Sequence, residues 1–116
     1  MLGYFSTLEL QQQVIDEIHR VLKPGGAFLY AENLVGSIFH TLARQLFVPS
    51  TRTWRFVTEE ELRTFLSAFS DHQFEKSGFL TAFTRSSFLE RPAYRIDRRL
   101  PVPSRWKYVG YGVARK

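Results

Sequence analysis

The stretch that decides the fold runs from Ile15 to Glu32 and reads IDEIHRVLKPGGAFLYAE. Its first eight residues carry apolar side chains at helical spacing, and Pro24 cannot continue a helix. Gly25 and Gly26 allow the chain to reverse direction. The apolar run that follows is typical of a strand covered on both faces. We therefore predict a helix, a tight turn and a buried strand, which together form one unit of a parallel α/β sheet.

Capping boxes predict where two of the helices begin. Ser6 and Glu9 have this spacing at the start of a helix over residues 9–22, and Thr58 to Glu61 repeats it at the start of another. A helix over residues 36–47 lies between them. The apolar faces expected to be buried are, in order, Leu10, Val14, Ile18, Val21 and Leu22; Ile38, Phe39, Leu42, Ala43, Leu46 and Phe47; and Leu62, Phe65, Leu66 and Phe69.

The last third of the chain is less regular. Residues 72–77 are predicted to form a short strand that Gly78 ends, and residues 106–114 are predicted to form the final strand. Between them, residues 90–105 hold three prolines and five arginines, which indicates a basic irregular connection.

Composition limits the classes of function. The chain has 116 residues, 44% of them hydrophobic, and no cysteine. Disulfides, thiolate zinc sites and a cysteine nucleophile are therefore excluded, and a cytoplasmic protein is expected. No apolar run approaches the roughly 20 residues of a membrane span, so no membrane partner is expected. The three histidines lack metal-ligand spacing, so no metal site is expected. The net charge is +5, and the positive balance lies in residues 85–116, where nine basic and two acidic residues give +7.

The run from Ile15 to Glu32 resembles a signature of class I S-adenosylmethionine-dependent methyltransferases, of the type 11 and type 25 kind. In that family an Arg-Val-Leu-Lys-Pro-Gly-Gly turn leads into the fifth strand of a Rossmann-like seven-stranded sheet. The helix opening at Thr58, a sixth strand near Phe74 and a final strand ending Val-Ala-Arg-Lys follow in the same order. The resemblance implies an α/β domain with strands 5, 6 and 7 in the spatial order 5-7-6, and methyl transfer to a small or medium acceptor.

The resemblance also implies parts that this sequence lacks. The family holds S-adenosylmethionine with a glycine-rich loop after its first strand, and no G-x-G-x-G segment occurs here. Residues 1–116 are therefore expected to be the C-terminal half of a methyltransferase domain, not competent alone. Tyr4 and Phe5, near the end of the family's fourth strand, are the expected cofactor contacts. A strand over residues 27–32 without its neighbour exposes an apolar edge, through which we expect pairing with itself or a partner.

Ligands of open α/β sheets gather at the carboxyl ends of strands, which makes Glu32 and Asn33 the first candidates for chemistry. Glu32 is a candidate general base and His40 a weaker one, while Asn33 is a candidate substrate contact. Trp54 and Arg55 lie where this family carries an acceptor-binding cover and are further candidate substrate contacts. Simpler roles stay open. Glu32 and Asn33 also suit a solvated strand end, His40 a partly buried helix position, and Trp54 a loop anchor.

Two other functions stay open beside methyl transfer. In-line displacement at the methyl carbon needs little acid–base help, because the sulfonium is a strong donor and positioning supplies much of the catalysis. A non-catalytic truncated relative would instead act as a pairing or interaction subunit. The arginine-rich segment 91–105, with Tyr94 and Trp106, would bind nucleic acid through phosphates and stacking. We expect a small-molecule acceptor rather than nucleic acid as the partner.

Overall fold

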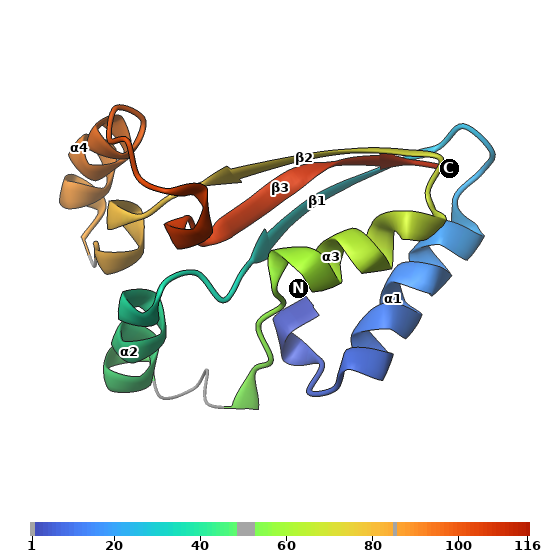
Figure 1. The fold of residues 1–116 in the computed structure, drawn as a ribbon, viewed down its shortest axis with the longest axis horizontal. Coiled ribbons are helices and arrows are strands. Elements are labelled where there is room, and N and C mark those ends of the chain that lie inside the picture. The colour runs from blue at the N-terminus through green and yellow to red at the C-terminus, as the bar shows by residue number, and fades with distance from the viewer. Residues whose placement is uncertain (1, 49–52, 85) are drawn as a thin grey trace.

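The computed structural model describes residues 2–48, 53–84 and 86–116, which form a mixed α/β fold around one sheet (Figure 1). β1 (Ala27–Asn33) and β2 (Asp71–Ser77) run in the same direction, and β3 (Val109–Arg115) lies between them, antiparallel to both. The spatial order β1-β3-β2 agrees with the expected order of the three strands. The prediction of a parallel sheet is wrong, because β3 separates the two strands that share a direction. The described residues form three strands, not a seven-stranded Rossmann-like sheet.

The helices occupy two places around the sheet. α1 (Leu8–Val21), α3 (Glu59–Phe65) and the 3-10 turn η3 (Leu66–Ala68) lie against one face, whereas α2 (Ile38–Phe47) and α4 (Ser87–Asp97) lie at the end where β1 and β2 finish (Figure 1). The other described 3-10 turns are η1 (Leu2–Tyr4), η4 (Leu80–Phe83) and η5 (Ser104–Trp106). No helix in the described ranges combines the length and apolar character needed to cross a membrane.

The core lies between α1, α3 and the sheet face that they cover, which we call the inner face. In the strand register, the inward rows are Phe28–Ala114–His72, Tyr30–Gly112–Phe74 and Glu32–Gly110–Lys76. Leu62, Phe65, Leu66 and Phe69 are buried against this face. The apolar face predicted for the third helix is therefore confirmed.

Two glycines of β3 make room for side chains from both edge strands. A Cβ at Gly112 would lie 2.7 Å from the phenol oxygen of Tyr30, and one at Gly110 would lie 2.7 Å from the ring of Phe74. Tyr30 crosses the middle strand and donates a hydrogen bond of 2.8 Å to the carbonyl oxygen of Gln73 on β2. A larger residue at Gly112 would block that crossing, because it would occupy the space of the phenol.

The opposite face of the sheet, which we call the outer face, is largely open. Burial alternates along β1, and Leu29 is 78% exposed. The prediction that this strand is covered on both faces is therefore wrong: its apolar run was typical of two covered faces, but the described helices cover only one. α4 reaches the outer face only near the start of β3, where Tyr94 and Tyr111 border a common hollow.

Three helix predictions need correction. Thr7, not Ser6, caps α1 by accepting a hydrogen bond from the Leu10 backbone, and the buried side of this helix centres on Gln11 and Ile15. Leu10 and Val21 are consequently exposed. Most apolar side chains of α2 are also exposed, contrary to the prediction: Ile38, Phe39, Leu42, Leu46 and Phe47. The predicted irregular connection over residues 90–105 is partly helical, because α4 is capped by Ser86 and continues through Pro92.

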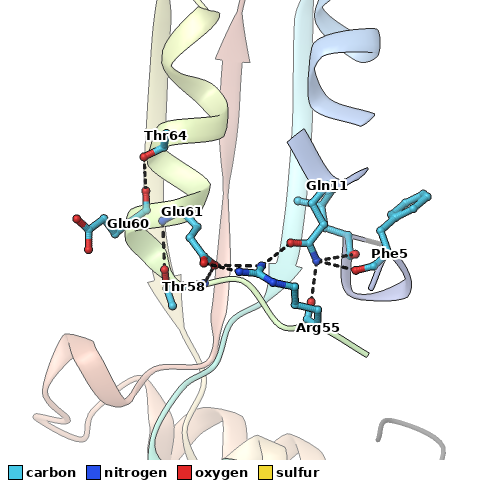
Figure 2. A network of polar contacts seen from close by, with 8 residues as sticks. Phe5, Gln11, Arg55, Thr58, Glu60, Glu61 and Thr64 are labelled. Carbon is cyan, nitrogen blue, oxygen red and sulfur yellow. Dashed lines mark hydrogen bonds and ion pairs between the residues drawn. The ribbon is translucent and has the colours of Figure 1, made fainter. Parts of the chain in front are cut away.

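A buried amide holds the N-terminal turn, α1 and the segment before α3 together (Figure 2). Gln11 is completely buried, and its Nε2 lies within hydrogen-bond distance of the carbonyl oxygens of Leu2 (3.0 Å), Phe5 (3.1 Å) and Arg55 (2.8 Å). Its Oε1 accepts a hydrogen bond of 2.6 Å from Arg55 Nη1. Arg55 in turn pairs with Glu61 at the start of α3. One side chain thus satisfies backbone groups of the N-terminal turn and of Arg55, which lies 44 residues after Gln11 in the sequence.

We predict that Gln11→Ala lowers the free energy of unfolding by about 3 kcal/mol or more, since it leaves carbonyl oxygens and a guanidinium without their buried partner. The matched control is Gln12→Ala, because the side chain of the neighbouring Gln12 donates to Asp16 at an exposed position. This control substitution should lower the free energy of unfolding by no more than about 0.5 kcal/mol. Urea unfolding monitored by circular dichroism gives both values. Equal losses in the two variants would contradict the role assigned to Gln11.

Candidate functional site

A cavity of about 550 Å³ opens between the carboxyl end of β1, α2 and η4. Other hollows of similar size exist on the described surface, but this one gathers side chains from five segments far apart in the sequence. Its lining includes Asn33, His40, Arg44, Trp54, Phe56, Thr81, Phe83, Thr84 and Tyr108. The size suits a small organic molecule, and the mixture of aromatic walls with a few polar groups is typical of a ligand site.

His40 forms the centre of one aromatic wall. It is 1% exposed, and its ring stacks between Phe83 and Tyr108, with centroid distances of 5.0 and 5.1 Å. Phe79 meets the same ring edge-on at 5.2 Å. The wall therefore consists of stacked rings from α2, η4 and the segment before β3, with the Phe79 ring edge-on to His40.

Hydrogen bonds fix the protonation of His40. Its Nδ1 lies 3.2 Å from the Ser37 backbone N–H, which can only donate, and 2.8 Å from the Ser37 hydroxyl. Nδ1 is therefore an acceptor, and Nε2 carries the proton that it donates to the Phe79 carbonyl oxygen at 3.1 Å. Burial lowers the pKa of His40, partly opposed by the bond to Phe79. Both nitrogens are engaged, which favours a structural role over that of a general base.

Glu32 also has a structural partner. Its side chain points to the inner face, is 6% exposed and accepts a hydrogen bond of 2.9 Å from the Leu2 backbone N–H. It thereby fixes the N-terminal turn to the end of β1. Asn33, one residue later, points the other way and lines the cavity. The alternation of the strand thus separates the two residues that the sequence placed together.

The remaining candidates divide between the cavity and its support. Trp54 lines the cavity, and its ring lies 4.5 Å from that of Tyr4, which is 69% exposed. Phe5 contributes its carbonyl oxygen to the bond with Gln11. Arg55 turns away from the cavity toward Gln11 and Glu61 (Figure 2). The structure thus brings Asn33, His40 and Trp54 together and places Arg55 in the network behind them.

Among the described residues that line the cavity, Arg44 is the charged one, and it was not among the site residues predicted from the sequence. Its guanidinium donates to the carbonyl oxygens of Leu34 at 2.9 Å and Val35 at 3.2 Å, and lies 3.9 Å above the ring of Phe56. Burial lowers the pKa of Arg44, although arginine stays charged at neutral pH. A signal for it was present in the sequence, since Arg44 is the one Lys or Arg in the stretch from Ile38 to Phe47.

Asp97 holds the far wall of the cavity in place. Its carboxylate accepts backbone N–H bonds from Phe79, Leu80 and Thr81 at 2.7–3.1 Å, and the Thr81 hydroxyl at 2.9 Å. Burial alone would raise the pKa of Asp97, but these hydrogen bonds outweigh it and the pKa is lowered. The end of α4 is thereby fixed to η4, which carries Phe83.

The described residues around the cavity do not fit S-adenosylmethionine. Gly36, between β1 and α2, has a positive φ of 69°, but protein side chains fill the space beside it: a Cβ there would lie 3.0 Å from Tyr108 Cβ and 3.2 Å from His40 Nδ1. The described lining of the cavity includes no carboxylate that would hold a ribose. Tyr4 faces Trp54 rather than a cradle of backbone amides.

We predict that the stability of the protein falls as the pH drops from about 7.5 to about 5.5. The unfolded chain binds a proton at His40 near the usual pKa of about 6.5, whereas the folded chain binds it only at lower pH, so protonation favours unfolding. The lowered pKa values of Glu59, Glu61 and Asp97 act below this window. The urea concentration at the unfolding midpoint should fall as the pH is lowered across this range. His40→Gln should reduce this dependence on pH, and the control His72→Gln should retain it. A dependence unchanged in His40→Gln would contradict this assignment.

Comparison with known proteins gives no information about function. No family model matches this chain, and no match is found among the curated proteins or among the solved structures.

Proposed function

We propose that this chain is the acceptor-binding part of a methyltransferase that uses S-adenosylmethionine, and that it holds a small or medium planar acceptor in the aromatic cavity. The observation that carries the proposal is the cavity itself, which lies at the carboxyl end of β1. Ligands of α/β sheets gather at such ends. The segment over Ile15–Glu32 that resembles the methyltransferase family contributes this strand end.

The part assigned to this chain is binding and orientation. Side chains with acid–base chemistry near the cavity are engaged in structure: His40 through both ring nitrogens, and Asp97 through four donors. Methyl transfer depends on holding the two reactants in line, so an aromatic cavity that fixes a planar acceptor is sufficient for this role. Because the residues here do not fit the cofactor, the isolated chain is expected to be inactive.

The matched pair Phe83→Ala and Phe88→Ala tests the cavity. Phe83 lines it, whereas Phe88 is 85% exposed on α4 and is not among its lining residues. We expect 2-naphthol, a planar compound with a methylatable hydroxyl, to shift the amide and indole NMR signals of Asn33, Trp54 and Tyr108. Phe83→Ala should weaken its affinity by about fivefold or more through lost ring contact, and Phe88→Ala should not.

S-adenosylmethionine is the second arm of the same experiment. Titration of the chain with this cofactor should produce no binding in calorimetry at micromolar concentrations. Naphthol shifts confined to residues outside the cavity, or equal weakening in the two phenylalanine variants, would overturn the acceptor-binding proposal. Micromolar binding of S-adenosylmethionine would overturn the claim that this chain lacks the cofactor site.

The edge of the sheet favours a second function, as a pairing subunit. β1 has β3 on one side and no second strand on the other in the described parts of the chain. The Leu34 backbone N–H donates to the Tyr108 carbonyl oxygen at 2.6 Å, so the alternation of an antiparallel ladder directs the backbone groups of Ala27, Leu29 and Ala31 toward the free edge. Beyond them, Leu34 forms a parallel bridge with Val57, which covers the carboxyl end of this edge. With Leu29 78% exposed, this edge is open and apolar. Such an edge is a template for pairing with another strand.

Leu29→Lys and Gln73→Lys test this pairing as a matched pair. The two positions lie in one row of the outer face, on the edge strands β1 and β2. We expect the unmodified chain to form dimers at micromolar concentrations in sedimentation. Leu29→Lys should be monomeric, because an edge lysine opposes strand pairing, and Gln73→Lys should dimerise. A monomeric unmodified chain at 100-fold higher concentration, about 100 μM, would rule out self-pairing.

A further inference from the structure

Arg44 presents a cation to the cavity in a fixed orientation. Its bonds to the carbonyl oxygens of Leu34 and Val35 hold two of the guanidinium nitrogens, and the Phe56 ring covers one face of the group. A guanidinium has five N–H donors, so several are left for another partner. Because Arg44 lines the cavity, these donors are placed where a ligand would bind.

No carboxylate balances this charge within the described residues. The ion pairs of the described chain join Arg20 to Glu17, Arg55 to Glu61, and Arg63 and Lys76 to Glu59. None involves Arg44, and the described lining of the cavity contains no acid. Asp97, whose charge is felt at His40, already accepts four hydrogen bonds from η4. A half-buried cation without a counter-charge favours an anion more strongly than an exposed cation does.

The other polar groups of the cavity favour an acceptor of hydrogen bonds. The hydroxyl hydrogens of Thr81 and Thr84 are donated to Asp97 and to the Thr81 carbonyl oxygen. The side chains of Asn33, Trp54 and Tyr108 make no hydrogen bond to the described residues, and each has a donor. Beside Arg44, these three side chains can each offer a donor to an oxyanion.

We propose that the ligand of this cavity is a planar aromatic acid whose carboxylate binds Arg44 while its ring lies against the aromatic walls. The inference rests on the proposed acceptor-binding function and names the class of acceptor. A carboxylate matches the planar fork of the guanidinium in two parallel hydrogen bonds. The rings of Trp54, Phe56 and Phe83 supply the apolar surface for the aromatic part.

Calorimetry with 2-naphthoate and its neutral amide, 2-naphthamide, tests this inference on the full chain. The two compounds share one ring system and differ in charge. We expect the acid to bind about tenfold tighter than the amide, as expected for a charge-assisted hydrogen bond. Added salt should weaken the binding of the acid and leave the binding of the amide unchanged, since only the acid binds through the charge of Arg44.

The matched variants are Arg44→Met and Arg63→Met. Arg63 also lies over a phenylalanine, Phe74, but on α3 and away from the cavity lining. Arg44→Met should abolish the preference for the acid and retain binding of the amide, whereas Arg63→Met should keep the preference. Thermal melting establishes that each variant is folded. If Arg44→Met does not fold, Arg44→Lys, which keeps the charge but not the fork, replaces it and should reduce the preference without removing the salt dependence.

The outcomes separate this inference from the function on which it rests. If neither compound binds or shifts the signals of cavity residues, the acceptor-binding proposal fails. If both bind equally in the unmodified chain, the cavity stands and the carboxylate inference is overturned. Equal losses for acid and amide in a folded Arg44→Met variant would also overturn it, because Arg44 would then act only as a wall.

Discussion

The hydrogen bond between Gln11 and Arg55 is the constraint on which the cavity depends. Gln11 is buried in α1, and it holds both the carbonyl oxygen and the guanidinium of Arg55. With Arg55 fixed toward the core, its neighbours Trp54 and Phe56 line the cavity on the other side. The same amide binds the N-terminal turn, whose Tyr4 ring lies against Trp54. A buried polar contact thus sets the direction of an aromatic wall that it does not itself touch.

The polar groups around the end of β1 likewise form hydrogen bonds that hold the fold together. Glu32 holds the Leu2 backbone, His40 joins Ser37 to Phe79, and Asp97 closes the turn at Leu80. The bonds at Leu2 and Ser37 are buried, and leaving such a polar group unpaired costs about 1–3 kcal/mol, whereas the bonds at Phe79 and Leu80 are partly buried. They position the walls of the cavity and leave few groups free to transfer a proton. The geometry therefore supports binding more directly than acid–base catalysis.

Local signals in the sequence predicted much of the fold. The Thr58–Glu61 capping box, the turn at Gly25 and the strand near residues 27–32 depend on neighbouring residues, and the structure has all three. The direction of β3 and the covering of one face alone depend on contacts between distant segments. The apolar pattern of β1 therefore led to two wrong predictions, a parallel sheet and a strand covered on both faces. α4 was missed because Pro92 indicates a break, whereas the cap at Ser86 and the bonds to Asp97 favour the helix.

The candidate site was predicted by position but not by role. The end of the strand led to Asn33, and the aromatic loop led to Trp54, both of which line the cavity. The role of Arg55 was not predictable from its neighbours, because its partner Gln11 is distant in the sequence. An arginine near a helix end is also favoured by the helix dipole, so the position of Arg44 in the sequence does not by itself indicate a binding role. Only its contacts with Leu34, Val35 and Phe56 show that it is held beside the cavity.

The middle strand places its small residues on one face of the sheet and its larger apolar residues on the other. β3 directs its small residues, Gly110, Gly112 and Ala114, to the inner face, where Tyr30 and other side chains of the edge strands fill the space. Its larger apolar residues, Val109, Tyr111 and Val113, point to the outer face. A sheet covered on one side alone normally has the reverse pattern, with large apolar residues inside and polar residues outside. Together with exposed Leu29 on β1, this pattern makes the part of the outer face next to the β1 edge apolar, which is consistent with the pairing proposed for that edge.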